Sequence, residues 1–412
     1  MTHGGQFCKL TLRDIPLRNK TVLLRVDYNV PLTKNGKVID DYRIRSSLPT
    51  IKKLRSYGCK VVIISHLGRP NGVHNKKYSL EPAAERLASL LAAPVRFVDD
   101  CVGYKVKMAI KRAPSASITV LENLRFYAQE EANDTTFAKR LASDSGADYF
   151  IQDGFGVVHR AHASTVAITQ YLPSVAGLLL EREYLTITKS IVNPARPVLA
   201  IIGGAKISDK LPIISAMISV ADTIAIGGAL ANTILAHKGY GLGASKIEQG
   251  QEPAIESIYT AIANTTTGNK APALIVLPQD LGVGTSLAMT ATRKDVSING
   301  VGTREMALDI GPKTTSQIIS LITTAGTVLW NGPLGYSEVP AFAKSSVAIA
   351  SALASNPRIV SIIGGGDTAD FAIKWDKKSG KSFTHVSTGG GASLELMSGA
   401  LLPGVESLMD AH

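Results

Sequence analysis

Short apolar runs rich in β-branched residues alternate along the chain with stretches of helical periodicity. The runs lie at 21–26, 60–65, 118–122, 148–152, 197–202, 222–226, 273–277, 326–330, 358–363 and 383–387. Several stretches between them, at 45–57, 81–92, 208–220 and 314–324, repeat apolar positions at the spacing of an amphipathic helix. Strands that alternate with helices in this way predict parallel sheets covered by helices on both faces. We therefore expect an α/β protein.

The chain is long enough for two such sheets. Its 412 residues exceed what a single hydrophobic core usually supports, and 45% of them are apolar. The segment IVNPARPV at 191–198 carries two prolines directly after a predicted helix at 181–191, which marks a link between domains. We predict two doubly wound, parallel-sheet, Rossmann-like domains of similar size, residues 1–182 and 198–392, joined by an interdomain helix and hinge at 183–197.

Three glycine-rich turns follow predicted strands in the second half. They are VLAIIGGAKISDK at 198–210, SIIGGGDTAD at 361–370 and HVSTGGGASLE at 385–395. Glycine lets a backbone approach an anion closely, and the N-terminus of the following helix receives negative charge. One such turn has even odds of serving only tight packing, but three together predict a nucleotide site. The spacings GxxxxGK[ST] and GxGxxG do not fit these turns, so the P-loop and dinucleotide-binding readings are disfavoured.

Charged residues near these turns have two readings each. Lys206 and Lys210 would lie on one helical face and reach phosphate if the following helix began early. Asp367, directly after three glycines, is either a helix N-cap or a residue that holds Mg²⁺ on nucleotide phosphates. Glu338 ends WNGPLGYSE at 330–338, where it is placed to meet a ribose hydroxyl, although alone that segment is an ordinary turn.

In the first half, basic and polar side chains follow the predicted strands, in RVDYNVP, SHLGRP, ENLRF and DGFGVVHRAHAS. Ligands of open parallel sheets bind at the carboxyl ends of the strands. The candidates for a polyanion site there are Arg43, His66, Arg69, Arg125 and Arg160. Arginine suits this role because its planar guanidinium binds phosphate or carboxylate in a bidentate manner. The alternative is that each arginine pairs with a nearby acid such as Asp27, Asp41, Glu122 or Asp153.

The remaining polar residues of the first half also have alternatives. Asp27 and Asn29 either bind a substrate hydroxyl or carboxylate or cap the turn before Pro31. His66 and His162 serve in proton transfer or only as hydrogen-bond donors, so no general base is assigned. Phosphoryl transfer between two preformed anions needs little acid or base catalysis, because positioning and charge stabilisation lower its barrier.

Composition narrows the class of partner and the compartment. The formal net charge of +11 suits anionic ligands, but the basic residues are scattered and only 6% are aromatic, which disfavours a nucleic-acid partner. Three cysteines without CxxC spacing indicate neither a disulfide framework nor a zinc site, so a reducing compartment fits best. No stretch approaches the roughly 20 apolar residues of a membrane span, and no apolar signal region begins the chain. We expect a soluble cytoplasmic protein without a membrane partner.

Ten motifs in order resemble those of the phosphoglycerate kinase family: RVDYNVP, DDYRIR, SHLGRP, ENLRF, DGFGVVHRAHAS, GGAKISDK, DIGPKT, WNGPLGYSE, GGGDT and STGGGASLE. The resemblance covers nearly the whole chain. It implies a two-lobed, monomeric phosphotransferase of glycolysis. This enzyme exchanges a phosphoryl group between 1,3-bisphosphoglycerate and MgADP, giving 3-phosphoglycerate and MgATP. The domains would close about 193–197, and a C-terminal segment at 393–412 would return to the first domain.

The resemblance also assigns the site residues. The phosphoglycerate site would be formed by Asp27, Asn29, Arg43, His66, Arg69, Arg125 and Arg160 of the N-terminal domain. The nucleotide site would be formed by Gly204, Ala205, Lys206, Lys210, Gly228, Asn331, Pro333, Glu338, Gly365, Gly366, Asp367 and Thr368, with the turn at 389–391. The residues expected to serve catalysis are Arg43, Lys206, Gly366 and Gly389, and Asp367 would hold Mg²⁺ through the nucleotide phosphates.

Some positions depart from the family pattern. Ala229 stands where a third glycine is usual, and Gly154, Val157 and Val158 replace the usual residues near HRAHAS. The sequences of the stretches at 277–286 and 300–308 also differ from the family's usual acidic or aromatic residues there, which bears on contacts to the nucleotide base. Two alternatives therefore stay open, a catalytically silent relative that binds nucleotide as a scaffold and a basic nucleic-acid-binding protein.

Overall fold

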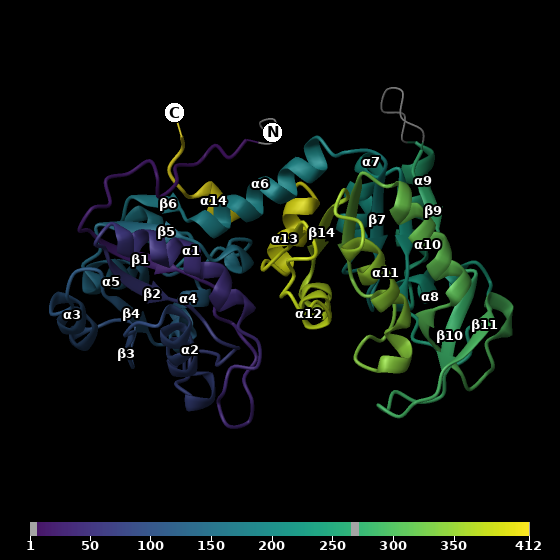
Figure 1. Cartoon of the computed structure of the whole chain (residues 1–412), viewed down its shortest axis with the longest axis horizontal. Coiled ribbons are helices and arrows are strands. Elements are labelled where there is room, and N and C mark those ends of the chain that lie inside the picture. The colour runs from purple at the N-terminus through teal and green to yellow at the C-terminus, as the bar shows by residue number, and fades with distance from the viewer. Residues whose placement is uncertain (1–5, 265–271, 412) are drawn as a thin grey trace. The chain divides into compact units, whose positions relative to one another are not determined.

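The computed structural model describes residues 6–264 and 272–411 and divides the chain into two compact units (Figure 1). Unit 1 is Met1–Leu185 with Leu401–His412, and unit 2 is Thr186–Ala400. The predicted segments 1–182, 198–392 and 393–412 also contain residues 1–5, 265–271 and 412, which lie outside the described residues. The units divide differently from the predicted segments, because 393–400 belongs to unit 2 and only the residues from Leu401 onward join unit 1.

Unit 1 is built on one sheet of six parallel strands. Across the sheet the order is β3 (Arg96–Val98), β4 (Ile118–Leu121), β2 (Lys60–Ile64), β1 (Thr21–Arg25), β5 (Tyr149–Gln152) and β6 (Ser174–Ala176). Its helices are α1 (Tyr42–Ser56), α2 (Glu81–Leu91), α3 (Tyr104–Lys111), α4 (Ala128–Glu131), α5 (Thr135–Ser145), α14 (Pro403–Glu406) and the first part of α6 (Leu178–Val192). The loops contain four 3₁₀ turns, η1 (Lys76–Tyr78), η2 (Leu124–Phe126), η3 (Phe155–Val157) and η4 (Ala167–Gln170).

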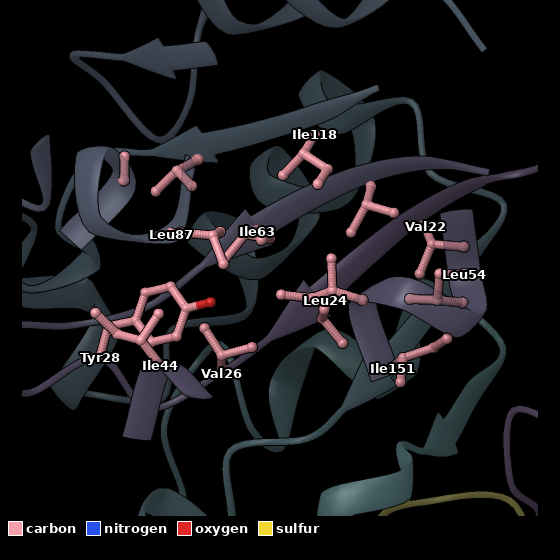
Figure 2. Close-up of a cluster of buried hydrophobic side chains, with 14 of the residues drawn as sticks. Val22, Leu24, Val26, Tyr28, Ile44, Leu54, Ile63, Leu87, Ile118 and Ile151 are labelled. Atoms are coloured by element: carbon pink, nitrogen blue, oxygen red, sulfur yellow. The ribbon is translucent and has the colours of Figure 1, made fainter. Parts of the chain in front are cut away.

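The helices cover both faces of this sheet because successive strand side chains point to opposite faces. Val22 and Leu24 of β1 share one core with Ile44 of α1 and Leu87 of α2 (Figure 2). Leu23, between them in β1, lies in the opposite core, which includes residues of α3 and α5. A central strand buried on both faces reads as a continuous apolar run, and TVLLR has this pattern.

Unit 2 contains a second sheet of six parallel strands. Its order is β15 (His385–Val386), β14 (Val360–Gly364), β13 (Thr327–Asn331), β7 (Val198–Ile202), β8 (Thr223–Ile226) and β9 (Leu274–Val276). The helices are α7 (Leu211–Val220), α8 (Gly228–His237), α9 (Glu252–Ala263), α10 (Pro312–Thr324), α11 (Lys344–Ala354), α12 (Gly366–Trp375) and α13 (Gly391–Met397), together with the last part of α6. The predicted doubly wound α/β architecture is confirmed in both units.

A small antiparallel sheet in unit 2 was not predicted. It consists of β11 (Lys294–Ser297), β10 (Asp280–Gly284) and β12 (Met306–Ile310), with short 3₁₀ turns η5 (Ile298–Gly300) and η6 (Pro340–Phe342) nearby. The sequence signal is weak because DLGVG contains two glycines and KDVS is polar, so neither segment shows the apolar alternation of a half-buried strand.

Candidate active site

The predicted polyanion residues of unit 1 follow neighbouring strands. Because β4, β2, β1 and β5 are adjacent and parallel, their carboxyl ends share one edge of the sheet. Asp27 and Asn29 follow β1, His66 and Arg69 follow β2, Arg125 lies in η2 after β4, Arg160 follows η3 after β5, and Arg43 is in the first turn of α1. The fold therefore brings all seven residues to the same edge.

Asp27, Asn29 and Arg43 form a connected group at this edge. The Arg43 Nη1 donates to Asp27 Oδ2 at 2.8 Å and to the Asn29 carbonyl at 3.4 Å. Burial is the largest influence on Asp27 and opposes its ionisation, but the charge of Arg43 acts together with the Asn29 N–H and the charge of Arg25, so the pKa of Asp27 lies below its ordinary value. The Asn29 N–H donates to Asp27 Oδ1 at 3.0 Å, and Asn29 Oδ1 accepts from the Gly68 N–H at 2.9 Å. The turn-shaping alternative for Asp27 and Asn29 thus describes part of their role.

His66 is buried beside an arginine that the sequence analysis did not single out. The Nη2 of Arg25, at the end of β1, lies 3.3 Å from His66 Nδ1. Since a guanidinium only donates, Nδ1 accepts and the imidazole carries its proton on Nε2. Burial lowers the pKa of His66 well below its ordinary value, and the positive charges of Arg25 and Arg125 add to that effect. His66 is therefore a neutral hydrogen-bond donor.

Arg25 belongs to a buried network behind His66. Its Nε donates to Ser164 Oγ at 2.9 Å, and that hydroxyl donates to Glu130 Oε1 at 2.6 Å. The Glu130 carboxylate lies 3.9 Å from Arg25 Nη2 and supplies the opposite charge that a buried guanidinium requires. The sequence did indicate that Arg25 needs buried partners, because an arginine inside the apolar run TVLLRV must find hydrogen-bond acceptors and an opposite charge.

The arginines do not all pair with local acids. Arg125 contacts Glu131 at 3.2 Å, and its Nη1 donates to the Gly68 carbonyl at 2.8 Å. Arg160 Nε contacts His159 Nε2 at 3.1 Å, and the exposed Arg69 has no side-chain hydrogen bond or ion pair within residues 6–264 and 272–411. The local-acid alternative is therefore wrong for Arg69 and Arg160.

Asp27 pairs with Arg43 at 2.8 Å, so the local-acid alternative holds for that arginine, but the other three acids named in it have other partners. Asp41 is paired with Arg45 and Arg86, Glu122 accepts from Ser79 and Leu80, and Asp153 accepts from backbone N–H groups of α6. The Nε of Arg125 is buried and has no hydrogen-bond partner in the described structure. This edge of unit 1 therefore holds donors that an anion can satisfy.

In unit 2, glycines allow the strand ends to approach closely. A Cβ on Gly203, after β7, would lie 2.1 Å from the Pro333 carbonyl oxygen, and a Cβ on Gly332, after β13, would lie 2.0 Å from the Gly203 oxygen. Gly332 also has a positive φ of +93°. Both positions require glycine for packing of the two turns, so this part of the glycine pattern is structural.

Lys210 and Asn331 meet beside these turns. The Lys210 Nζ donates to Asn331 Oδ1 at 2.5 Å, while the Asn331 Nδ2 is buried without a partner in the described structure. Burial lowers the pKa of Lys210, and the nearby carboxylates of Asp367 and Asp209 oppose that shift. Thr368 Oγ1 accepts from the Gly332 N–H at 2.6 Å, which ties α12 to the turn after β13.

Two readings made from the sequence are corrected by helix boundaries. Helix α7 begins at Leu211, so Lys206 and Lys210 lie in the preceding loop and do not share a helical face. The N-cap of α12 is Gly365, and Asp367 is in the first helical turn without capping it. The N-cap alternative for Asp367 is therefore wrong. Its exposed carboxylate is an oxygen donor of the kind that Mg²⁺ prefers.

A cavity of about 350 Å³ lies beside these turns within unit 2. Six predicted nucleotide residues line it: Gly204, Ala205, Gly228, Pro333, Glu338 and Asp367. Its other walls include Leu281, Met306, Leu308 and Tyr336, as well as the polar Asn232 and Lys246, none of which the sequence analysis assigned. Leu281, Met306 and Leu308 belong to the unpredicted small sheet and lie in the stretches 277–286 and 300–308, which the sequence analysis connected with the nucleotide base without assigning single residues. Tyr336 lies in the motif WNGPLGYSE. A cavity with one apolar part and one polar end suits a nucleotide.

The remaining predicted residues of unit 2 lie outside the cavity lining. Lys206 is exposed in the loop after β7, and Gly366 is exposed at the start of α12. Gly389 donates its N–H to Ser387 Oγ at 3.0 Å, while the Gly365 N–H donates to Ser393 Oγ at 3.3 Å. The second bond ties the turn after β14 to the one after β15.

The described residues offer neither a metal cage nor a membrane-spanning helix. Residues 6–264 and 272–411 contain no group of three or more His, Cys, Asp or Glu side chains arranged to hold a metal ion. Over the same ranges, no helix has the length and apolar character needed to cross a membrane.

Comparison with known proteins places these features in a family context. The model of the family described as phosphoglycerate kinase matches residues 12–400. A phosphoglycerate kinase of Moorella thermoacetica is 44% identical over 402 residues, covering 98% of this chain and 99% of that protein. The phosphoglycerate kinase structure from Pyrococcus horikoshii is 30% identical with a TM-score of 0.83, and the one from Coxiella burnetii is 34% identical with a TM-score of 0.81. Each covers 97% of this chain and 98% of the solved chain.

Proposed function

Because the chain belongs to the phosphoglycerate kinase family, we propose that its two residue clusters divide the substrates of that reaction between them. The enzyme is a phosphotransferase of glycolysis that exchanges a phosphoryl group between 1,3-bisphosphoglycerate and ADP, giving 3-phosphoglycerate and ATP. The observation that carries the proposal is the arrangement of unpaired donors at the strand ends of one sheet and a part-apolar cavity at those of the other.

The cluster of unit 1 binds phosphoglycerate in this proposal. Arg69, Arg125 and Arg160 supply guanidinium groups for the phosphate, which two parallel hydrogen bonds per arginine hold in a fixed orientation. The neutral His66 donates from Nε2, and Asn29 and Asp27 bind the hydroxyl and carboxylate end. Support comes from the burial of His66 and Arg125, which strengthens hydrogen bonds to a bound anion.

The cavity of unit 2 binds the nucleotide. The base lies against the apolar walls, Glu338 accepts from a ribose hydroxyl, and the phosphates lie toward Gly204, Lys206, Lys210 and the start of α12. Asn331 Nδ2, which is buried and unpaired in the described structure, donates to a phosphate oxygen. A helix N-terminus adds free N–H groups and a positive dipole end.

Magnesium fits this arrangement through the nucleotide. Mg²⁺ prefers oxygen ligands and commonly binds one or two carboxylates together with substrate phosphates. Three carboxylates line the cavity: Asp309 is paired with Arg293, Glu338 is proposed for the ribose, and Asp367 remains for the ion. The described residues offer no cage of three or more side chains. We infer that Asp367 and the phosphates would hold the ion, which when bound neutralises phosphate charge.

Catalysis then rests on charge stabilisation and position. Arg43 and Lys206 place positive charge beside the transferring group, and the backbone N–H groups near Gly366 and Gly389 donate to its oxygens. No covalent enzyme intermediate is needed, because the attacking oxygen of one substrate bonds to phosphorus as the bond from phosphorus to the leaving oxygen of the other substrate breaks, once the three atoms are in line. Since the two substrates occupy different units, turnover requires the units to bring them together and to exclude water from the acyl phosphate.

Three finer properties belong to this proposal. We infer a monomer, as the family resemblance implies, and a cytoplasmic location, which the free cysteines support. Nucleic acid is not expected as a partner, because the basic residues are scattered along the chain and only 6% of the residues are aromatic. A silent nucleotide-binding scaffold is less favoured, since the residues proposed for catalysis are all in place.

The test is steady-state formation of 1,3-bisphosphoglycerate from 3-phosphoglycerate and MgATP, coupled to a reductive dehydrogenase. We expect turnover by the wild type, and a loss of about 100-fold to 1,000-fold in kcat for Arg43→Ala and for Lys206→Ala. Arg45→Ala is the matched control, because Arg45 lies on the same helix but pairs with Asp41. Absence of turnover in folded wild type would favour the scaffold, and near-normal turnover of a variant would remove that residue from the chemistry.

A further inference from the structure

The loop at 203–210 carries Lys206 but has little structure of its own. It connects β7 to α7, and Lys206 and Ser208 are exposed within it. Ile207 is fully buried, at 0% exposure, and its carbonyl accepts from the Lys210 and Leu211 N–H groups at 3.0 and 2.8 Å. The backbone N–H groups of Ile207 and Ser208 need hydrogen-bond acceptors from outside the loop.

Glu248 supplies those partners. Its Oε2 accepts from the Ile207 N–H at 2.6 Å and from the Ser208 N–H at 3.2 Å, while Oε1 accepts from Ser208 Oγ at 2.5 Å. One carboxylate thus binds two consecutive N–H groups and a hydroxyl, as a capping residue does at a helix N-terminus. The Ser208 hydroxyl is the main reason why the pKa of Glu248 lies below its ordinary value.

The carboxylate is itself anchored to the wall of the cavity. The Glu248 N–H donates to Thr233 Oγ1 at 3.1 Å, and this hydroxyl donates to the Ala229 carbonyl at 3.1 Å. Both partners lie in α8, and Ala229 lines the cavity. Glu248 therefore links the two parts: its backbone N–H is bonded to the helix that lines the cavity, and its carboxylate is bonded to the loop that carries Lys206.

We propose that Glu248 is a positioning residue that fixes the Lys206 loop relative to the nucleotide cavity. The inference rests on the proposed role of Lys206 in the reaction. Without the carboxylate, three donors of the loop lose their common acceptor, and Lys206 moves relative to the transferring group. A displacement of about 1 Å at such a position is enough to cost about 100-fold in rate. Glu248 is not one of the residues that line the cavity, so its effect passes through the loop.

The experiment compares Glu248→Ala with Glu248→Gln and with Glu252→Ala, an exposed acidic control at the start of α9. For Glu248→Ala we expect kcat to fall about 10-fold to 100-fold and KM for MgATP to rise, with KM for 3-phosphoglycerate unchanged because that substrate binds unit 1. Glutamine keeps an acceptor oxygen for the two N–H groups, so it should restore most of kcat. Glu252→Ala should behave as the wild type.

A second readout separates positioning from general loss of structure. Amide hydrogen exchange at Ile207 and Ser208 should accelerate in Glu248→Ala and return toward the wild-type rate in Glu248→Gln, while the strands of unit 2 stay protected. Normal kinetics in Glu248→Ala, with Lys206→Ala still impaired, would overturn the inference alone. Near-normal turnover of Lys206→Ala would overturn it together with the proposed role of the loop.

Discussion

At the scale of single residues, function here depends on buried polar groups whose partners come from distant parts of the sequence. The strand-end positions of His66, Arg69 and Arg125 could be predicted because each follows an apolar run. The partners of Arg25 and of the Glu248 carboxylate could not be placed in the same way, since Ser164 lies 139 residues from Arg25 and Ser208 lies 40 residues from Glu248. Hydrogen bonds of this kind are created by folding and leave no local pattern.

Asp153 offers a test of such burial through pH. Its Oδ1 accepts from the Leu179 N–H at 2.8 Å, but Oδ2 is buried without a hydrogen-bond partner in the described structure. Burial is the main cause that raises its pKa from 3.8 to about 6. The folded state therefore binds this proton more tightly than the unfolded state does, and the associated stability is present below pH 4 and lost as pH rises to about 6.

We expect Asp153→Asn to escape that loss because an amide does not ionise. The free energy of unfolding of the variant, measured by urea denaturation relative to wild type, should rise by about 3 kcal/mol between pH 4 and pH 7.5. The pH trend of the difference is the readout, since any constant offset reflects packing of the amide. Parallel curves for the two proteins would contradict a raised pKa at this position.

At the scale of elements, the ten predicted strands were recovered because each combines a β-branched run with a turn or a helix start. The strand predicted at 383–387 is shorter in the structure, where β15 spans only His385–Val386. The small antiparallel sheet was missed because Gly282 and Gly284 interrupt the pattern of β10. Helix α7 was expected to begin at 208 and begins at Leu211, so the loop at 203–210, which carries Lys206, is longer than expected.

The glycine-rich turns contain positions of two physical kinds, and alanine substitution should separate them. Gly203→Ala places a Cβ 2.1 Å from a backbone oxygen, which cannot move without shifting the turn after β13. We expect a loss of about 3 kcal/mol in stability and a clearly lower Tm in thermal unfolding. An unchanged Tm would mean that the two turns can separate at little cost.

Gly366→Ala is the matched substitution at an open position. A Cβ there meets nothing within 4 Å, and the residue begins α12. We expect the free energy of unfolding to change by no more than about 1 kcal/mol, with a correspondingly small change in Tm, because alanine is favourable in a helix. Affinity for MgADP should nevertheless fall in calorimetric titration, since the methyl group would occupy space proposed for phosphate.

At the scale of the whole molecule, the chain enters unit 2 in helix α6 and leaves it after Ala400. The returning segment completes unit 1 through specific contacts. Lys9 Nζ pairs with Asp410 at 2.6 Å, and the Gly404 N–H donates to the Val158 carbonyl at 2.8 Å. Leu402 and Leu408 are buried at 1% and 3% exposure.

Ending the chain after Ala400 should therefore weaken unit 1 selectively. Each buried leucine contributes about 2 kcal/mol, and together with Val405 the loss is comparable with the stability of a domain. We expect hydrogen exchange to accelerate in the strands of unit 1 but not in those of unit 2, with MgADP binding retained. Equal acceleration in both units would show that the segment stabilises the molecule as a whole.

The two crossings of the chain also set the order in which the units can be finished during translation. Unit 2 has its complete sequence once residue 400 has been made, whereas unit 1 still lacks the segment from Leu401 that covers part of its core. The general tendency is for N-terminal domains to fold first as a chain emerges from the ribosome. In this protein the N-terminal unit begins first and is completed after unit 2, so nascent chains carry an unfinished first domain until the segment from Leu401 has been made.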